Sequence, residues 1–305
     1  MTRSYRLRAN LLLLLTAVIW GFAFVAQRSS MAHIGPFTFN AIRFFIGGLA
    51  LIPLMLTLDW QRVSAGKPVT GWHGRTLLAG GVVAGLILFA AASLQQMGIV
   101  FTTAGKAGFI TSLYVVLVPL FGLALGQRVS AAMWGGAVLA VLGLYFLSIE
   151  GGFRMAWGDL LVLIGALLWT CHVLLLGRLS PRTDPVKLAF AQFVVCAVLS
   201  GIAALLTESA TVAALRAAAV PILYAGILSV GMGYTFQTIA QGYTRPADTA
   251  IILSLEAVFA VIGGWLLLGE MLTMRALFGC ALMLAGILIS QLLGQPEEPV
   301  VEMSH

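Results

Sequence analysis

One carboxylate, that of Glu256, lies well inside an apolar stretch that is long enough to cross a lipid bilayer, ADTAIILSLEAVFAVIGGWLLLG. The other acidic residues lie near the ends of such stretches or outside them. A bare carboxylate in mid-bilayer is costly, so Glu256 must face a wet cavity, pair with a cation or stay protonated. Two interpretations follow: a site for a proton, a cation or a substrate amine, and a protonated acid that bonds to a neighbouring helix.

Two amides and two indoles lie deep in other apolar stretches. Gln95 and Gln237 can donate and accept hydrogen bonds, which suits a polar or zwitterionic solute, although amides also join helices within membranes. Trp20 and Trp169 lie about ten residues into their stretches, far from the interface where membrane tryptophans usually anchor. An indole at that depth can wall a pocket and stack on an aromatic or cationic ligand, or simply pack.

Further polar side chains complete the candidate site. His172 follows Trp169 by three residues on nearly the same helix face, where an imidazole can carry a proton or stay neutral and hydrogen-bonded. Arg43 lies seven residues into its stretch and Lys106 begins another, and we interpret both as gating or structural charges. The predicted substrate-binding residues are Trp20, Ser93, Gln95, Tyr114, Trp169, His172, Tyr234, Gln237 and Glu256. Of these, Glu256 and His172 are the candidates for carrying a coupled proton.

Signals for catalysis are weak. The string TTAGKAG is not a phosphate-binding loop, because the pattern GxxxxGK[ST] needs glycine in place of Val100 and a hydroxyl residue in place of Ala107. Neither HExxH nor GxSxG occurs in the sequence. Cys171, Cys196 and Cys280 all fall in apolar stretches, which argues against a disulfide framework or a metal site. We therefore predict no enzyme activity, no catalytic residue, no metal and no cofactor.

The composition is that of a polytopic membrane protein: 60% of the 305 residues are hydrophobic, 9% are charged and the mean hydropathy is +1.02. The net charge of +6 does not indicate nucleic-acid binding, since Lys and Arg stand singly at the ends of apolar stretches. With cytoplasmic termini, eleven of these cations fall on the cytoplasmic side and five outside, which fits the positive-inside rule. We expect a multi-pass protein of the bacterial inner membrane with both termini in the cytoplasm.

Ten apolar stretches can each cross the membrane as a helix. They are residues 10–28, 36–57, 76–97, 105–125, 131–149, 159–178, 186–206, 220–240, 247–268 and 273–293. Their short connections make sequential helices antiparallel neighbours. Pro36 and Pro185 open two of them at a first-turn position, and Asn10 and Asp159 are predicted to be the N-caps of two others.

The second half of the chain repeats the first. The ungapped alignments join 10–56 to 159–205 at a displacement of 149, 89–121 to 231–263 at 142, and 126–147 to 269–290 at 143. The matched pairs include Trp20 with Trp169, Arg43 with Gln192, Gln95 with Gln237, Tyr114 with Glu256, Gly136 with Gly279, and Gly143 with Gly286. With five spans in each half, the second copy must cross the bilayer in the opposite sense. The predicted fold is an all-α integral membrane protein of ten transmembrane helices, arranged as two inverted five-helix repeats.

The repeat also sets the predicted domain limits, which are 1–150 for the first copy and 151–293 for the second. Residues 294–305 are polar, acidic and contain proline, and we expect a disordered cytoplasmic tail. The basic start and following apolar run resemble a signal peptide, but their match with residues 159–177 predicts that the first span is retained. The two copies are expected to form one domain.

Several strings resemble the EamA-type permeases of the drug/metabolite transporter superfamily: WGFAF, the stretch 36–43 continuing into RFF, AGFITSLYVVLVPLF, and SLEAVFAVIGGWLLLGE. The resemblance covers about residues 8–293. It implies a ten-helix inner-membrane carrier with a central cavity between its halves, and bacterial relatives that export amino acids and other metabolites. Where the family commonly has proline after the glutamate of the ninth span, this chain has Ala257, which leaves a helix break beside Glu256 open.

We predict a secondary transporter that moves a small metabolite such as an amino acid outward by alternating access. A gradient must drive it because the sequence has no ATP-binding motif, and proton antiport through Glu256 is the coupling hypothesis. The alternatives are an exporter of cationic or amphipathic drugs, a passive channel or lipid scramblase, and a membrane-embedded enzyme. The expected partners are the solute, the lipid bilayer and protons, without nucleic acid, and we expect a monomer.

Overall fold

The computed structural model describes residues 3–66, 68, 74–126, 130–148, 157–269 and 274–293, and the regular elements of these residues are all helices. In chain order they are α1 (Arg3–Ser30), α2 (Pro36–Ser64), α3 (Arg75–Ile99), α4 (Ala104–Thr111), α5 (Tyr114–Ala124), α6 (Ala131–Ser148), α7 (Trp157–Leu179), η1 (Ser180–Arg182), α8 (Pro185–Thr207), α9 (Val212–Ala217), α10 (Ala219–Leu223), η2 (Tyr224–Tyr234), α11 (Thr235–Ala240), α12 (Pro246–Leu253), α13 (Glu256–Leu268) and α14 (Met274–Leu293). The tail predicted to be disordered, residues 294–305, lies outside the described residues.

The ten predicted stretches all correspond to helical segments. Eight segments are long and apolar enough to cross a membrane, some of them formed by consecutive helices such as α4 with α5 and α12 with α13. The remaining two, α6 and α14, hold shorter apolar runs, Ala131–Gly143 and Leu277–Gly286. Large aliphatic side chains lie on the outer surface, among them Leu205, which is 88% exposed. An apolar exterior of this extent is suited to contact with lipid.

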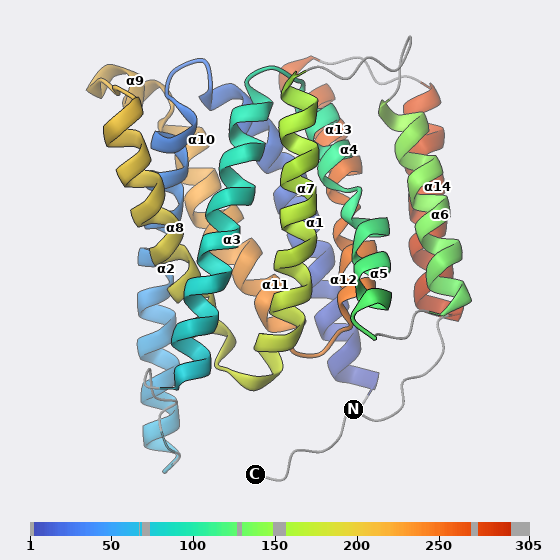
Figure 1. Ribbon diagram of the computed structural model, residues 1–305, viewed down its shortest axis with the longest axis horizontal. Helices are drawn as coiled ribbons and strands as arrows, with labels where there is room; N and C mark the ends of the chain where they lie inside the picture. Colours follow the sequence, from blue (N-terminus) through green and yellow to red (C-terminus); the bar gives the residue numbers. More distant parts are fainter. Residues whose placement is uncertain are drawn as a thin grey trace.

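The two halves of the chain run in opposite directions. In Figure 1, α1 begins on the lower side of the view and rises, whereas its repeat mate α7 begins on the upper side and descends. The same reversal relates α2 to α8. Because α14 ends on the side where α1 begins, the described helices start and finish on one side of the membrane, as an even number of crossings requires.

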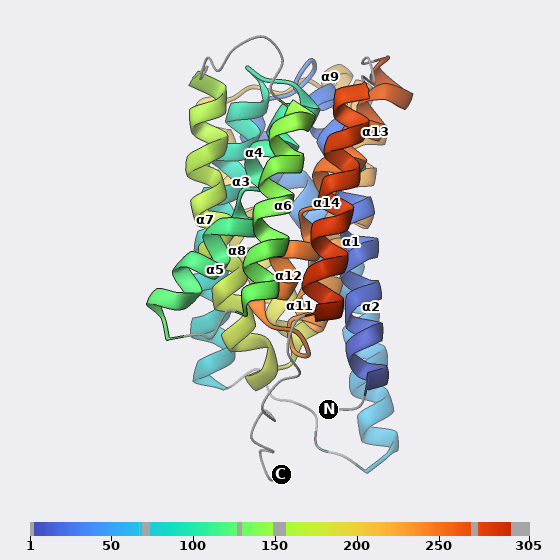
Figure 2. The ribbon, with the colours of Figure 1, turned by 90° about the vertical axis from the view of Figure 1, so that its right-hand side faces the viewer.

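Helices α6 and α14 lie side by side in Figures 1 and 2 and show the symmetry most directly. A Cβ added at Gly143 would lie 2.5 Å from the carbonyl oxygen of Gly279, and one added at Gly286 would lie 2.6 Å from that of Gly136. These contacts are reciprocal, since the four glycines form two repeat pairs. An approximate twofold axis therefore passes between α6 and α14, whose close approach supplies packing that the hydrophobic effect cannot give in lipid.

Two stretches predicted as continuous helices are interrupted at equivalent positions. The first breaks at Ser112 and Leu113, so that α5 begins at Tyr114, and the second breaks at Ser254 and Leu255, so that α13 begins at Glu256. The breaks contact each other, because Ser112 Oγ donates to the carbonyl of Ser254 at 3.4 Å. Ser254 Oγ donates in turn to Ile251 O at 2.7 Å. Hydroxyls and neighbouring helices thus satisfy the freed backbone groups, and no proline is needed after Glu256.

The predicted helix at 220–240 differs from a regular α-helix over Tyr224–Tyr234, where η2 is a π-helix. Its counterpart in the first repeat is part of the α-helix α3. Two carbonyls of η2 accept bonds from side chains of α1: Ser229 O from Trp20 Nε1 at 3.1 Å, and Gly233 O from Thr16 Oγ1 at 3.3 Å. Because π-helical turns free carbonyls in this way, they occur frequently at functional sites.

The predicted helix starts are confirmed for the prolines and wrong for the caps. Pro36 and Pro185 stand in the first turns of α2 and α8. Asn10 lies inside α1, which begins at Arg3, and Asp159 is the third residue of α7 as described. Apolar periodicity marks where a helix enters lipid, whereas the helix itself extends further into the polar region.

Candidate functional site

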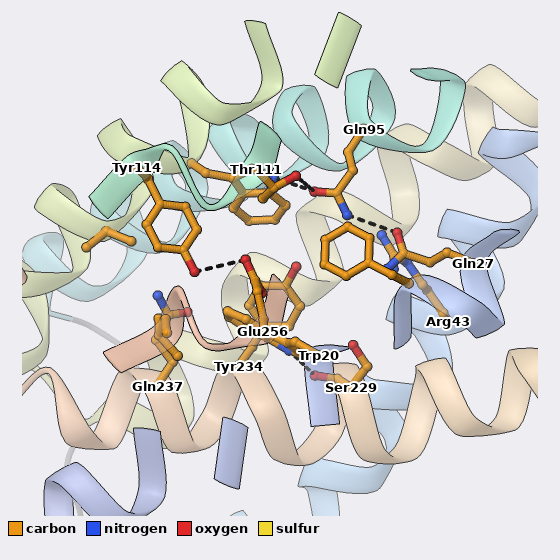
Figure 3. A pocket seen from close by; sticks show the side chains of 14 residues that line it. Trp20, Gln27, Arg43, Gln95, Thr111, Tyr114, Ser229, Tyr234, Gln237 and Glu256 are labelled. Atoms are coloured by element: carbon orange, nitrogen blue, oxygen red, sulfur yellow. Dashed lines mark hydrogen bonds between the residues drawn. The ribbon is translucent and has the colours of Figure 1, made fainter. Parts of the chain in front are cut away.

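A central cavity lies between the two halves, and Figure 3 shows the side chains around it. The lining residues are Trp20, Phe24, Gln27, Arg43, Gln95, Thr111, Tyr114, Trp169, Val173, Ser229, Tyr234, Gln237, Leu253 and Glu256. The cavity volume is about 30 Å³, which is room for one or two waters. In this conformation the cavity is therefore too small to hold a metabolite.

Most of the lining comes from repeat mates. Five pairs contribute both members: Trp20 with Trp169, Phe24 with Val173, Gln95 with Gln237, Thr111 with Leu253, and Tyr114 with Glu256. Helices α1 and α7, α3 and α11, α4 and α12, and α5 and α13 supply them. The twofold axis brings equivalent positions to one centre, so both halves wall the same space.

The buried carboxylate of Glu256 lies at this centre. The hydroxyl of its repeat mate Tyr114 donates to Glu256 Oε1 at 2.9 Å, as Figure 3 shows. Both residues are buried, and each opens the helix that follows a break, α5 or α13. The helix breaks thus place the only described carboxylate of the lining against a phenol from the opposite half, at the joint between the repeats.

Gln95 is held by three partners. Its amide Nε2 donates to Gln27 Oε1 at 3.0 Å, and its Oε1 accepts from Trp169 Nε1 at 2.8 Å and from Thr111 Oγ1 at 3.4 Å. This network joins α1, α3, α4 and α7 across the two repeats. Its repeat mate Gln237 is different, because the buried Oε1 of Gln237 has no hydrogen-bond partner among the described residues.

Aromatic rings form the wall around the carboxylate. Tyr234 is 4.6 Å from Trp20 and 5.9 Å from Trp169 between ring centroids, and it packs on Phe44 and Phe193 in the main core. Such a wall can hold an apolar or aromatic side chain of a solute. Gly233 beside it allows the close approach of Trp20, since a Cβ there would lie 2.5 Å from the indole nitrogen.

Arg43 is the one cation among the lining residues. Its guanidinium carbon lies 5.1 Å from the ring centre of Phe39 and 4.9 Å from that of Phe44, and the residue is 1% exposed. The described residues offer no ion pair or hydrogen bond to its Nε or Nη2. The sequence assigned Arg43 a gating or structural role, and the structure adds that it faces the cavity.

Two of the predicted binding residues lie outside the lining. Ser93 is buried elsewhere on α3, with no hydrogen-bond partner for its hydroxyl among the described residues. His172 lies behind Trp169, edge-on at 5.7 Å between ring centroids, and its Nε2 is 2.7 Å from Gln192 Oε1. Its contacts support the lining ring of Trp169, and they do not present its imidazole to the cavity.

Lys106, the other predicted gating charge, lies at one end of the molecule. Its Nζ pairs with Asp159 Oδ2 at 2.5 Å, and Asp159 Oδ1 accepts from Thr102 Oγ1 at 2.9 Å. These bonds join the start of α4 to the start of α7. The side chain of Asp159 is 3% exposed and was mistaken for a cap, because a sequence does not reveal which two helix ends meet.

The lining includes residues that the sequence did not single out, chiefly Gln27, Thr111 and Ser229. For Gln27 a signal exists, since it follows Trp20 by two helical turns on the same face, with Phe24 between them. Ser229 lies on the π-helix, where its carbonyl accepts from Trp20 Nε1, and no sequence pattern marks it.

The comparisons with known proteins decide the family. A model described as the EamA-like transporter family matches residues 7–149 and again residues 156–292, once in each repeat. The chain belongs to the EamA-like transporter family. An Archaeoglobus fulgidus protein named an uncharacterized transporter is similar to this EamA-like protein, with 33% identity over 292 residues, 94% of this chain and 87% of the relative.

Two further likenesses agree with this family. A Salmonella typhimurium protein named "Probable amino-acid metabolite efflux pump" is 24% identical to this EamA-like chain over 298 residues, which is 92% of the chain and 93% of the relative. A solved crystal structure shares the fold with a TM-score of 0.74 at 21% identity, covering 93% of this chain and 96% of the other. The EamA-like protein is thus a multi-pass membrane transporter.

Proposed function

We propose that the protein is a secondary transporter that exports a small metabolite, such as an amino acid, through the central cavity by alternating access. The observation that carries the proposal is the cavity itself, built from five repeat pairs around a buried Tyr114–Glu256 contact. A site formed by two inverted halves can be exposed to either side when the halves rock. The name of the Salmonella typhimurium relative supports amino acids as the first solutes to test.

Ion pairs between the halves support the alternating-access part of the proposal. On one side of the membrane Lys106 of α4 pairs with Asp159 of α7. On the other side the repeat mate of Lys106, Asp248 of α12, lies 3.9 Å from Arg6 of α1 and is also bonded to Arg245. Each pair joins the first turn of a broken helix to the first helix of the opposite half. Exposure of the cavity to one side would require the pair on that side to break.

Glu256 is the proposed proton site. A proton on this carboxylate removes a buried charge, and a cationic group of the solute can replace the proton at the same oxygens, which gives exchange of one for the other. Tyr114 donates to Glu256 from the opposite half, so binding of a proton or a solute cation to the carboxylate can change the contact between the two repeats. The proposal places both termini in the cytoplasm of a bacterial inner membrane, with the protein acting as a monomer.

Reconstitution in liposomes tests the function. Labelled amino acids, organic cations and small organic anions are screened for uptake with and without an imposed pH gradient. We expect uptake of at least one amino acid and its stimulation by the gradient. Glu256→Gln should abolish the stimulation, whereas Glu208→Gln should keep it, because Glu208 caps the start of α2 outside the cavity by accepting from the Phe37 and Thr38 amides. Transport by Glu256→Gln with unchanged pH dependence would refute the proton site.

A further inference from the structure

The guanidinium of Arg43 is a buried cation without a counter-charge. It lies within α2, is 1% exposed and faces the cavity, and the described residues place no carboxylate within ion-pair distance of it. Its nitrogens Nε and Nη2 have no acceptor among the described residues. Packing on Phe39 and Phe44 offsets part of the cost of burial, but these side chains have no nitrogen or oxygen that could accept a hydrogen bond from the two donors.

The two unpartnered nitrogens lie on the same edge of the guanidinium group. Their N–H bonds point the same way, roughly parallel, at the spacing of the two oxygens of a carboxylate. A buried charged donor without a hydrogen-bond acceptor costs folding free energy, and inside a membrane an unpaired arginine usually indicates a functional site. The donor pair therefore has the geometry of a carboxylate site whose occupant does not come from the described part of the protein.

The repeat mate of Arg43 shows that the fold does not need a cation at this position. Gln192 occupies the equivalent place on α8 and is also buried, but its Oε1 is engaged by His172 Nε2 at 2.7 Å. Gln192 does not line the cavity. A neutral amide thus suffices where only packing is required, and the cation occurs in the copy whose side chain reaches the cavity.

We propose that Arg43 binds the carboxylate of the transported molecule through Nε and Nη2. This assignment rests on the proposed function and specifies its substrate class: a solute with a carboxylate at one end. Figure 3 shows Arg43 beside Gln27, away from Gln237, with Trp20, Tyr234 and Glu256 between them. The carboxylate of an amino acid enters as the cavity widens, its ammonium group points toward Glu256 and the unpartnered Gln237 Oε1, and its side chain packs on the rings.

A ligand series tests the assignment without any mutation. In the reconstituted wild-type protein, the amino acid transported fastest is challenged by its own amide and by its decarboxylated amine as competitors, for example L-phenylalaninamide and phenethylamine against labelled L-phenylalanine. Both analogues keep the amine and the side chain but lose the carboxylate. A charge-assisted bidentate contact corresponds to an affinity loss of about 10- to 100-fold for each analogue. Competition as strong as that of the unlabelled amino acid overturns the assignment.

Arg43→Gln and Arg43→Lys provide the second arm. Arg43→Gln introduces the side chain of the repeat mate, and we expect KM for the amino acid to rise about 10- to 100-fold. The amino-acid amide should inhibit transport by the variant and by the wild type with the same affinity. Arg43→Lys keeps the positive charge but loses the pair of parallel N–H donors, so its KM should lie between that of the wild type and that of Arg43→Gln. Arg275→Gln is the matched control, because Arg275 also lies over two rings, Tyr145 and Phe146, but outside the cavity. It should leave KM unchanged.

The outcomes separate this assignment from the proposed function. If an amino acid is transported and its amide competes equally, or if Arg43→Gln folds and keeps the wild-type KM, the Arg43 assignment fails and the transport function stands. If only organic cations without an anionic group are transported, the Arg43 assignment and the amino-acid part of the proposed function both fail. If small organic carboxylates are transported in place of amino acids, the amino-acid part of the proposed function fails. The Arg43 assignment then stands if Arg43→Gln raises KM for the transported carboxylate.

Discussion

Gly233→Ala tests whether the wall of the cavity depends on close approach of Trp20 to the π-helix η2. The added Cβ would lie 2.5 Å from the indole nitrogen and 3.1 Å from Cδ1, whereas ordinary contacts begin at 3.4 Å. The ring must therefore move by nearly 1 Å, which stretches or breaks its 3.1 Å bond to Ser229 O. Overpacking costs about 1–3 kcal/mol and a lost neutral hydrogen bond about 1 kcal/mol, which together give about 2–4 kcal/mol.

The assay is thermal unfolding of the purified protein in detergent, together with KM for the transported solute. We expect Gly233→Ala to lower the melting temperature by several degrees and to raise KM, because Trp20 lines the cavity. Gly231→Ala is the control, since a Cβ there would meet Ala50 at an ordinary 3.4 Å on the same π-helix.

A double variant isolates the contact. Trp20→Phe removes the indole nitrogen, so Gly233→Ala should cost about 1 kcal/mol less in that background than in the wild type. The close-approach argument would be refuted if Gly233→Ala and Gly231→Ala lowered the melting temperature equally. It would also be refuted if the stability losses of Gly233→Ala and Trp20→Phe were strictly additive.

Three further changes have distinct expected outcomes. Asp159→Asn removes the partner of a half-exposed Lys106, so stability should fall by no more than about 1 kcal/mol, while hydrogen exchange in the first turn of α4 rises; unchanged exchange there would argue against an ion-pair closure. Tyr114→Phe removes the donor to Glu256 and should move the midpoint of the pH profile of transport, which a proton site elsewhere would leave in place. His172→Gln should lower the melting temperature through the lost bond to Gln192 but keep the pH dependence; loss of that dependence would restore the imidazole as a coupling group.

The sequence predicted the symmetric part of the cavity lining, and substrate binding by these residues stays a prediction. Repeat alignment paired Trp20 with Trp169 and Gln95 with Gln237, and all four line the cavity, because an approximate twofold axis carries equivalent positions to the same centre. Ser93 was predicted to bind substrate together with Gln95, but it does not line the cavity. Residues two apart on a helix do not share a face, and helix phase decides where a side chain points.

The backbone irregularities were not predictable in the same way. The breaks before Tyr114 and Glu256 and the π-helix η2 lie in mostly apolar stretches whose isolated polar residues form no continuous polar face for periodicity to follow. Contacts between the two halves stabilise these irregularities, as Ser112 with Ser254 and Trp20 with Ser229 illustrate. The Lys106–Asp159 pair was missed for a related reason, since it joins helix ends 53 residues apart.

Counterflow in proteoliposomes tests the central claim most directly, that solute crosses by alternating exposure of one cavity between inverted halves. Vesicles are loaded with an unlabelled amino acid found in the uptake screen, diluted into the same labelled amino acid, and compared with empty vesicles. We predict transient accumulation of label above equilibrium in loaded vesicles. Entry of label at the same rate into loaded and empty vesicles, without accumulation, would contradict alternating access and indicate a channel.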